Sequence, residues 1–567
     1  MSNFESEQSV GLPGRLNAGN KQQYEFLMKM ERQTFTWGYA QNRIRRTQRW
    51  ADRLWLLGLL LAALLLFGIN LGSLPLQDWG EGTVALVARE IKNAPLEAFT
   101  WLYPKIAGKP YLEAPPLLHS LIAGAYKIGG VNEWTTRLPG AIVSALSVPL
   151  LYQIGREIFP SRQSAIFSSL IYLTFLPVVC DGRLAMVDGM ALCFVMLMMW
   201  CVLRSRRDLR WSLGIGIGLG LICLTKGILI GLLFLAIAFS YLGWDTPRLL
   251  TSRYWWFGLL LGSSPAIAWY TGGVLQYGQT FVTKGIINPS LQGLWSPVSD
   301  RNSTPWYYLV EFLKFSTPWL LFFPYGLWLA WENRNWGWAK LVLVWSGIYA
   351  LALLLTLSQV PLYVLPIYPA LALASGVQLA EVWNWPTRQS FPRVWSSGLV
   401  VLALGAIALS VYFSISEAAF ESLSVVFASV ALTISIAAVL IARRDLQFIL
   451  ILFWGTYVSL LLLMSSPYWS GELKEAYPVK PIAGILKRGT PQGQLIYASF
   501  SSKRPALDFY SDRQVIPASI SELEQHWQED PQPYLLLDTQ THKQLKLEES
   551  QLVGKAPGWV LISKPTH

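Results

Sequence analysis

The chain contains 567 residues, of which 53% are hydrophobic and only 14% are charged, and its formal net charge is +11. An ordinary soluble protein carries about 25% charged residues, so this composition excludes a soluble globular protein. The basic residues occur in short clusters between apolar runs, whereas a nucleic-acid groove needs Lys and Arg interleaved with exposed aromatic residues. We therefore expect a membrane protein with no nucleic-acid partner, whose excess of Lys and Arg lies on cytoplasmic loops.

The first segment, residues 1–53, is polar and ends in the basic sequence "NRIRRTQRW". An apolar run over about 54–74 follows it directly, and this run is too long and too far from the start for a cleaved signal peptide. Because basic flanks stay in the cytoplasm, we expect a cytoplasmic N-terminal segment followed by a membrane anchor.

Further apolar runs of about 20 residues follow, the length that crosses roughly 30 Å of hydrocarbon in helical form. They predict an α-helical polytopic membrane protein with about thirteen spans in a transmembrane domain over residues 54–465. The later spans are expected at about 134–155, 163–180, 186–203, 211–225, 227–243, 254–271, 306–330, 341–357, 361–380, 395–415, 422–442 and 445–465.

The distribution of basic residues orients these spans. If thirteen spans alternate, every loop on the cytoplasmic side carries at least two basic residues, whereas the opposite loops "SEAAFE" and "LSQV" carry none. The N-terminus is therefore expected in the cytoplasm and the C-terminus outside it, in the cytoplasmic (inner) membrane. The basic residues of the predicted inner loops are Arg156, Arg162, Arg204, Arg206, Arg207, Arg210, Arg248, Arg253, Arg334, Lys340, Arg388, Arg393, Arg443 and Arg444.

Two large regions fall on the predicted outer side. In the first outer loop, residues 75–133, the spacing of Val84, Val87, Ala88 and Ile91 predicts a short amphipathic helix. A second helix-like piece, "LLHSLIAGAYKI", follows two prolines, and we expect both helices to lie along the membrane interface. The outer C-terminal domain, residues 466–567, alternates "QLIYASF", "PYLLLD" and "GWVLIS" with the helix-like "SISELEQHW", which predicts a small α/β domain.

Charged residues gather at the predicted outer ends of the spans. A charge within the membrane costs about 2.5–3.5 kcal/mol on insertion scales, so such residues usually face a wet cavity. One interpretation is a shared polar cavity, in which a base deprotonates a hydroxyl while cations hold a phosphate leaving group. The alternative is that these charges pair with one another, for example Arg183 with Asp181. The residues concerned are Asp78, Glu81, Glu113, Asp181, Arg183, Asp188 and Lys226.

Several motifs in order then resemble one family. The sequences "DWGEGTVALVAREI", "WLYPKIAGKPYLEAPPLLHSLIA", "NEWTTRLPG", "RLAMVDG", "LTKG" and "PLYVLPIYPALALA" are similar to those of GT-C membrane glycosyltransferases, over about residues 50–380. The subgroup contains aminoarabinose lipid A transferases and dolichyl-phosphate-mannose–protein mannosyltransferase-like enzymes. The resemblance implies transfer of a sugar, usually with inversion, from a polyprenyl-phosphate carrier to a lipid or protein hydroxyl on the outer face of the membrane.

The resemblance also implies roles for individual residues. Asp78 or Glu81 is expected to be the catalytic base, with Asp188 as a second catalytic acid. Lys226, Arg183 and Tyr363 are expected to contact the carrier phosphate, and Glu113 to contact substrate.

The sequence departs from the family pattern at three positions. Gly80 stands where the family commonly has the acid of an Asp-Glu pair, Ala114 stands where it often has the lysine of "KPP", and Gln359 replaces a lysine before "LPxY". Two alternatives to an active transferase therefore remain open. One is a non-catalytic paralogue that binds carrier lipid, and the other is a lipid or sugar transporter, although no inverted repeat is evident.

The sequence gives little support for metal or thiol chemistry. His119 is the only one of four histidines near the proposed cavity, so a histidine-rich zinc site is not expected. A single divalent cation on Glu81, Glu113 or Asp188 remains open, because hard cations take carboxylate ligands. The cysteines Cys180, Cys193, Cys201 and Cys223 lie in or beside apolar segments and are interpreted as small hydrophobic residues.

Overall fold

The computed structural model of the chain describes residues 49–95, 101–106, 108–292, 306–385, 390–416, 420–470, 477–545, 547 and 550–565. The chain divides into two compact units, Met1–Gly58 and Leu59–His567. Of the first unit, the structure describes only the helical residues 49–58.

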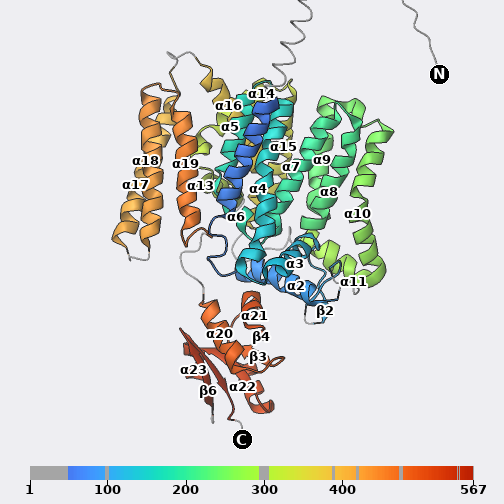
Figure 1. Ribbon diagram of the computed structural model, residues 1–567, viewed down its shortest axis with the longest axis vertical. Coiled ribbons are helices and arrows are strands. Elements are labelled where there is room, and N and C mark those ends of the chain that lie inside the picture. The colour runs from blue at the N-terminus through green and yellow to red at the C-terminus, as the bar shows by residue number, and fades with distance from the viewer. Residues whose placement is uncertain are drawn as a thin grey trace, which may run out of the picture. The chain divides into compact units, whose positions relative to one another are not determined.

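The second unit is dominated by long apolar helices (Figure 1). Among the described residues, ten helices are long and apolar enough to cross a membrane, or eleven if a helix pair bent by 59° is one span. That pair is α5 (Arg162–Leu173) and α6 (Leu176–Arg183). The others are Arg49–Gly68, α4 (Glu133–Ile158), α7 (Val187–Ser205), η3 (Leu209–Trp211) with α8 (Ser212–Lys226), α9 (Ile228–Asp245), α15 (Gly337–Leu354), η7 (Pro361–Ile367) with α16 (Tyr368–Trp383), α17 (Arg393–Ile415), α18 (Glu421–Ala442) and α19 (Phe448–Ser465).

The count of ten or eleven differs from the thirteen spans expected, and two segments account for the difference. The predicted span 254–271 is a helix, α10 (Arg253–Tyr277), which lies beside α8, but its Trp, Tyr, Gly and Ser residues make it less apolar than the others. The predicted span 306–330 is divided into α13 (Tyr307–Phe315), η6 (Trp319–Leu321) and α14 (Phe323–Glu332), each too short to cross a bilayer alone. The remaining short elements of this region are η4 (Pro247–Leu249), α11 (Gln279–Phe281) and η5 (Val282–Gln292).

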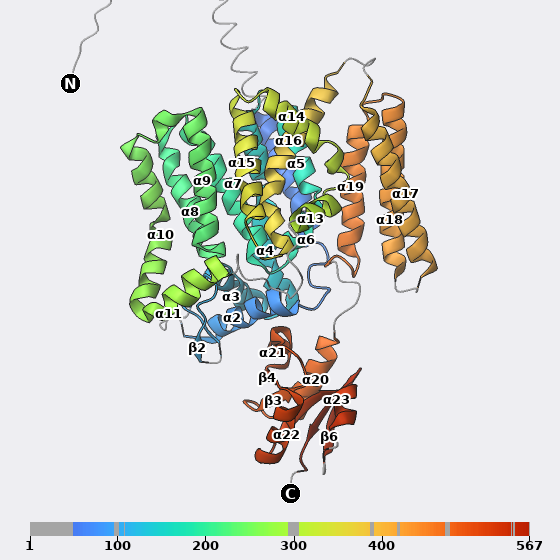
Figure 2. The same ribbon diagram turned by 180° about the vertical axis from the view of Figure 1, so that it is seen from behind.

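The first loop contains the two helices predicted from its sequence. They are α2 (Thr83–Asn93) and α3 (Leu117–Gly129), preceded by the single π-helical turn η1 (Asp78–Gly82) and separated by the short strands β1 (Lys105–Ile106) and β2 (Lys109–Pro110). The predicted apolar face of α2 is buried against α3, with Val87 and Ala88 in contact with the same core as Leu118 and Ile122. Both helices lie across one end of the bundle, on the side of the C-terminal domain (Figures 1 and 2).

The C-terminal domain is a small mixed α/β structure, as predicted. Its five-stranded sheet has the order β4-β3-β5-β7-β6, with β3 parallel to β4 and β5 and with antiparallel pairs β5–β7 and β6–β7. Apolar clusters cover both faces of the sheet. The predicted strands correspond to β3 (Leu495–Ala498), β5 (Tyr534–Asp538) and β7 (Trp559–Ser563), and the predicted helix to α22 (Ile520–Glu529). The other elements are α20 (Val479–Gly489), α21 (Pro505–Ser511), β4 (Gln514–Pro517), α23 (Thr539–Gln544) and β6 (Gln551–Ala556).

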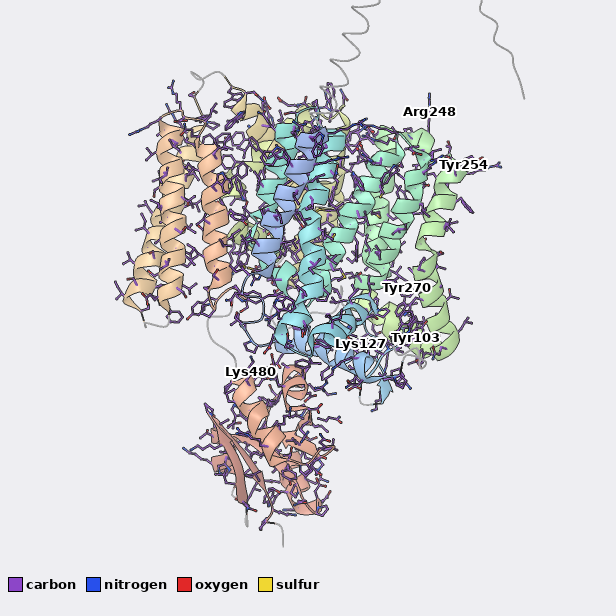
Figure 3. All side chains as sticks on the ribbon, in the orientation of Figure 1. Tyr103, Lys127, Arg248, Tyr254, Tyr270 and Lys480 are labelled. Carbon is purple, nitrogen blue, oxygen red and sulfur yellow. The ribbon has the colours of Figure 1, made fainter. Side chains whose placement is uncertain are left out.

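The loops fall into two groups at opposite ends of the bundle. The basic connections between α4 and α5, α7 and α8, and α9 and α10 lie at one end, and the first loop and the C-terminal domain lie at the other (Figures 1 and 2). Figure 3 shows this separation in the positions of Arg248 and Lys480.

Candidate active site

A cavity of about 520 Å³ opens near the end of the bundle that carries the first loop. One wall is apolar and comes from α9 and α15, with Leu229, Leu233 and Leu353 among its residues. The polar lining consists of Glu113, Thr225, Lys226, Tyr349, Thr356 and Tyr363. The cavity therefore combines two charged side chains with a largely apolar lining.

Lys226 and Asp188 form an ion pair beside this cavity, with Nζ 2.5 Å from Oδ1. Lys226 ends α8 and Asp188 lies in the first turn of α7, positions at which the helix dipoles favour a cation and an anion, respectively. The Lys226 side chain is 21% exposed, and its Nζ lies 5.4 Å from the centre of the Tyr363 ring. Three of the predicted site residues are thus brought together.

Glu113 lies at the rim of the same cavity, on an exposed segment that continues into Ala114 and Pro115. Behind this segment the buried His119 has its Nδ1 3.1 Å from the carbonyl oxygen of Pro115. Burial lowers the pKa of His119 to about 4, so the imidazole is neutral at physiological pH. His119 therefore supports the Glu113 segment as a neutral hydrogen-bonding group.

Glu81 does not face the cavity. Its side chain is 0% exposed and forms a two-bond ion pair with Arg137, at 2.8 Å from Nε and 2.7 Å from Nη2. Its carboxylate also accepts the backbone N–H of Ala185 and of Gln77. The remaining donors of Arg137 bind the carbonyl oxygens of Leu71, Leu74 and Pro75. Glu81 therefore ties the first loop to α4 and to the segment before α7.

Asp78 keeps partial access to solvent. Its side chain is 12% exposed, and it accepts hydrogen bonds from Tyr477 Oη at 2.8 Å and from Arg504 Nη1 at 3.0 Å. Both partners belong to the C-terminal part of the chain. Of the two acids predicted as base, Asp78 is the one whose side chain keeps an exposed surface.

Gly80 lies against the start of α7. A Cβ atom at this position would come within 2.0 Å of the terminal Cε of Met186. The next residue, Val187, lines the cavity, and Asp188 follows with its ion pair to Lys226. The turn η1 that carries Asp78 therefore packs against the residue before Val187, and the Met186 side chain fills the space that a side chain at position 80 would need.

Arg183 is directed away from the cavity. Its guanidinium donates to the carbonyl oxygens of Leu66 and Ile69 and lies 4.4 Å from the centre of the Trp469 ring. These carbonyl groups lie at the end of the first helix and accept from both terminal nitrogens of the guanidinium. Arg183 therefore connects the end of α6 to the end of the first helix.

The described residues offer no cluster of metal ligands at the candidate cation site. Among the described residues, no group of three or more His, Cys, Asp or Glu side chains could hold a metal ion. Glu81 is taken up by Arg137 and Asp188 by Lys226.

Several residues that build the site were not expected from the sequence. Arg137 lies within the quoted motif "NEWTTRLPG", so its position was available although its role was not. No motif pointed to Tyr477, Arg504 or Trp469.

Together, the fold and the site define a polytopic membrane protein that has a small C-terminal α/β domain and a partly polar cavity lined in part by the first loop. The arrangement matches a solved fold: ArnT from Cupriavidus metallidurans bound to undecaprenyl phosphate superimposes with a TM-score of 0.72 at 18% identity, over 90% of this chain and 98% of that one. The apo form of the same protein gives 0.71.

Sequence comparisons find similarity to related proteins. Residues 113–269 match the model of the dolichyl-phosphate-mannose-protein mannosyltransferase family. The undecaprenyl phosphate-alpha-4-amino-4-deoxy-L-arabinose arabinosyl transferase 1 of Pseudomonas fluorescens is 28% identical over 345 residues, 58% of this chain and 60% of the relative. An uncharacterized protein of Aquifex aeolicus is 24% identical over 472 residues, 81% of this chain and 87% of its own. The chain is thus similar in part of its sequence to this family and to these transferases.

Proposed function

We propose that the chain transfers a sugar from a polyprenyl-phosphate carrier to a hydroxyl group of a lipid or protein acceptor. The observation that carries this proposal is the Lys226–Asp188–Tyr363 group beside a cavity that has both charged and apolar lining. A carrier lipid has the same division, with a charged phosphate next to an apolar prenyl chain. The relatives named above supply the donor class.

On the donor side, Lys226 holds the carrier phosphate by charge-assisted hydrogen bonds, and the Tyr363 hydroxyl adds a further donor. Asp188 keeps the ammonium in place when the phosphate is absent. The wall formed by α9 and α15 accommodates the first isoprene units. Glu113, at the rim, contacts the sugar.

On the acceptor side, Asp78 acts as the general base. The acceptor oxygen attacks the anomeric carbon as its proton passes to the Asp78 carboxylate, and the bond from that carbon to the carrier phosphate oxygen breaks. The carrier leaves as the phosphate monoester, with its negative charge next to Lys226. A single displacement of this kind inverts the anomeric centre.

A second candidate, a non-catalytic protein that binds carrier lipid, is favoured by one observation. The place of the usual family acid at Gly80 is filled by Met186. This candidate shares the donor site with the transferase and differs from it only at the acceptor side. The two are therefore separated by turnover and not by donor binding.

Replacing Lys226 with methionine is expected to weaken the binding of undecaprenyl phosphate at least tenfold. A hydrogen bond to a charged group contributes about 1.5–3 kcal/mol, which corresponds to a factor of roughly 10–150. Binding is measured on the purified protein in nanodiscs. The double variant Lys226→Met/Asp188→Asn removes the carboxylate that the single variant leaves unpaired, and Lys314→Met, at an exposed lysine of α13, is the matched control. Unchanged binding in both Lys226 variants would exclude this donor site.

We further propose that the site opens on the outer face of the membrane. In this arrangement, α10 and the α13–α14 segment also cross the membrane. Reporter fusions after residue 470 should then read as external, and fusions at Arg206 as cytoplasmic, because the basic loops remain inside. The assay compares alkaline phosphatase and fluorescent protein activity of each fusion. A cytoplasmic reading after residue 470 would reverse the proposed orientation.

A further inference from the structure

The C-terminal domain contacts the first loop through α21 at close range. A Cβ atom at Gly82 would lie 2.5 Å from the backbone nitrogen of Ala506 and 3.0 Å from the carbonyl carbon of Pro505. The backbones of η1 and α21 can approach this closely only because residue 82 has no side chain. Phe509 of α21 also joins the apolar core of the first loop. The contact therefore combines close backbone packing at Gly82 with apolar side-chain packing at Phe509.

Charged groups reinforce the contact. Asp78 pairs with Arg504, Arg89 with Asp512 at 3.2 Å, and Glu133 with Lys480 at 2.6 Å. In each pair one residue comes from the first loop or the start of α4, and the other comes from the C-terminal domain. The Asp78–Arg504 pair differs from the others in that it involves a residue of the proposed reaction site.

The geometry around Asp78 fixes the direction of its carboxylate. Tyr477 donates to Oδ1 and Arg504 to Oδ2, so each oxygen has one donor and a rotation of the carboxylate would break both bonds. The Arg504 guanidinium is itself held over the rings of Tyr477, at 5.0 Å, and Phe500, at 5.3 Å. Burial and the neighbouring Asp78 raise the pKa of Tyr477, so its hydroxyl stays protonated and continues to donate. A carboxylate has about four lone-pair positions, and free positions remain to accept a proton.

We propose that Arg504 and Tyr477 are positioning residues for Asp78, which makes the C-terminal domain a part of the transferase active site. This inference rests on the proposed function, because the positioned group is the proposed base. It adds that the acceptor side of the site is assembled from two segments more than 390 residues apart in the chain.

The experiment uses the full-length protein in nanodiscs, with Arg504→Gln, Arg504→Lys and Tyr477→Phe. Arg504→Gln is expected to lower kcat at least tenfold and to leave the KM for the donor unchanged. Arg504→Lys should recover part of the loss, since a lysine can still donate to one carboxylate oxygen. Lys503→Gln, at the exposed neighbouring residue, is the control and should behave as the wild type. Hydrogen exchange of the amides of residues 77–82 is measured on the same samples and should increase in Arg504→Gln.

The outcomes separate the two proposals. An unchanged kcat in Arg504→Gln would overturn the positioning role. A loss of kcat that Arg504→Lys does not relieve, accompanied by weaker donor binding, would overturn it as well. No turnover in the wild type, with increased exchange in Arg504→Gln, would overturn the proposed function and leave a purely structural contact. Gly82→Ala gives an independent check, because it separates α21 from η1 without removing a charge, and it should lower kcat and raise exchange in the same way.

Discussion

Asp78→Asn is expected to lower turnover by about 10² to 10⁴, or roughly 3–5 kcal/mol of barrier, because general-base assistance contributes that much to proton transfer. Asparagine keeps the volume of the side chain and one oxygen that accepts from Tyr477 or Arg504. Folding and donor binding should therefore change little. The measurement is the release of undecaprenyl phosphate from a polyprenyl-phosphate-sugar extracted from membranes, followed by mass spectrometry.

Asp512→Asn is the matched control for this variant. Asp512 also pairs with an arginine at the contact between the C-terminal domain and the first loop, but its side chain is 55% exposed and lies outside the proposed reaction site. Near-normal turnover in Asp78→Asn, together with a large loss in Glu113→Gln, would move the role of base to the acid at the cavity rim.

Glu81→Gln is expected to act on stability. The substitution leaves the Arg137 guanidinium, whose side chain is 1% exposed, without its counter-charge. Removing one partner of a buried ion pair costs about 3–5 kcal/mol, a large share of the total stability of a protein. The variant should accumulate poorly and lose its tertiary structure at a lower temperature in detergent, while the molecules that do fold retain donor binding.

The double variant Glu81→Leu/Arg137→Met tests the cause. Replacing both members of a buried pair by apolar residues often restores stability, so this variant should melt closer to the wild type than Glu81→Gln does. A Glu81→Gln protein with wild-type melting and no turnover would contradict the structural role and return Glu81 to the catalytic residues.

The sequence predicted most of the features that depend on local patterns. The periodicity of α2 and the alternation of strand-like and helix-like pieces in the C-terminal domain are properties of short segments, and the structure contains them. Lys226 and Asp188, both expected at span ends, form an ion pair, whereas Tyr363 beside them was expected from the family resemblance. The difference in the number of spans arises where composition is intermediate, in α10, or where prolines divide a segment, between α13 and α14.

The partners of the two acids in "DWGEG" could not be predicted in this way. Glu81 binds an arginine 56 residues away, and Asp78 binds residues 399 and 426 positions away. Such pairings depend on how complete elements pack, and a local pattern contains no information about them. The sequence alone therefore could not distinguish the carboxylate of Glu81, in a fully buried ion pair, from that of Asp78, at a domain contact.

The contact between Gly80 and Met186 has a consequence for how this chain could have diverged from its relatives. An aspartate at position 80 and a methionine at position 186 compete for the same volume, since the first Cβ would lie 2.0 Å from the end of the second side chain. Because the tip of a methionine is flexible, a side chain at position 80 would be tolerated only after the Met186 side chain moves. Across relatives the two positions should therefore vary together, with a smaller residue at the second wherever the first is acidic. The order of mutations is constrained as well: shortening Met186 first opens the space, whereas introducing the acid first crowds it.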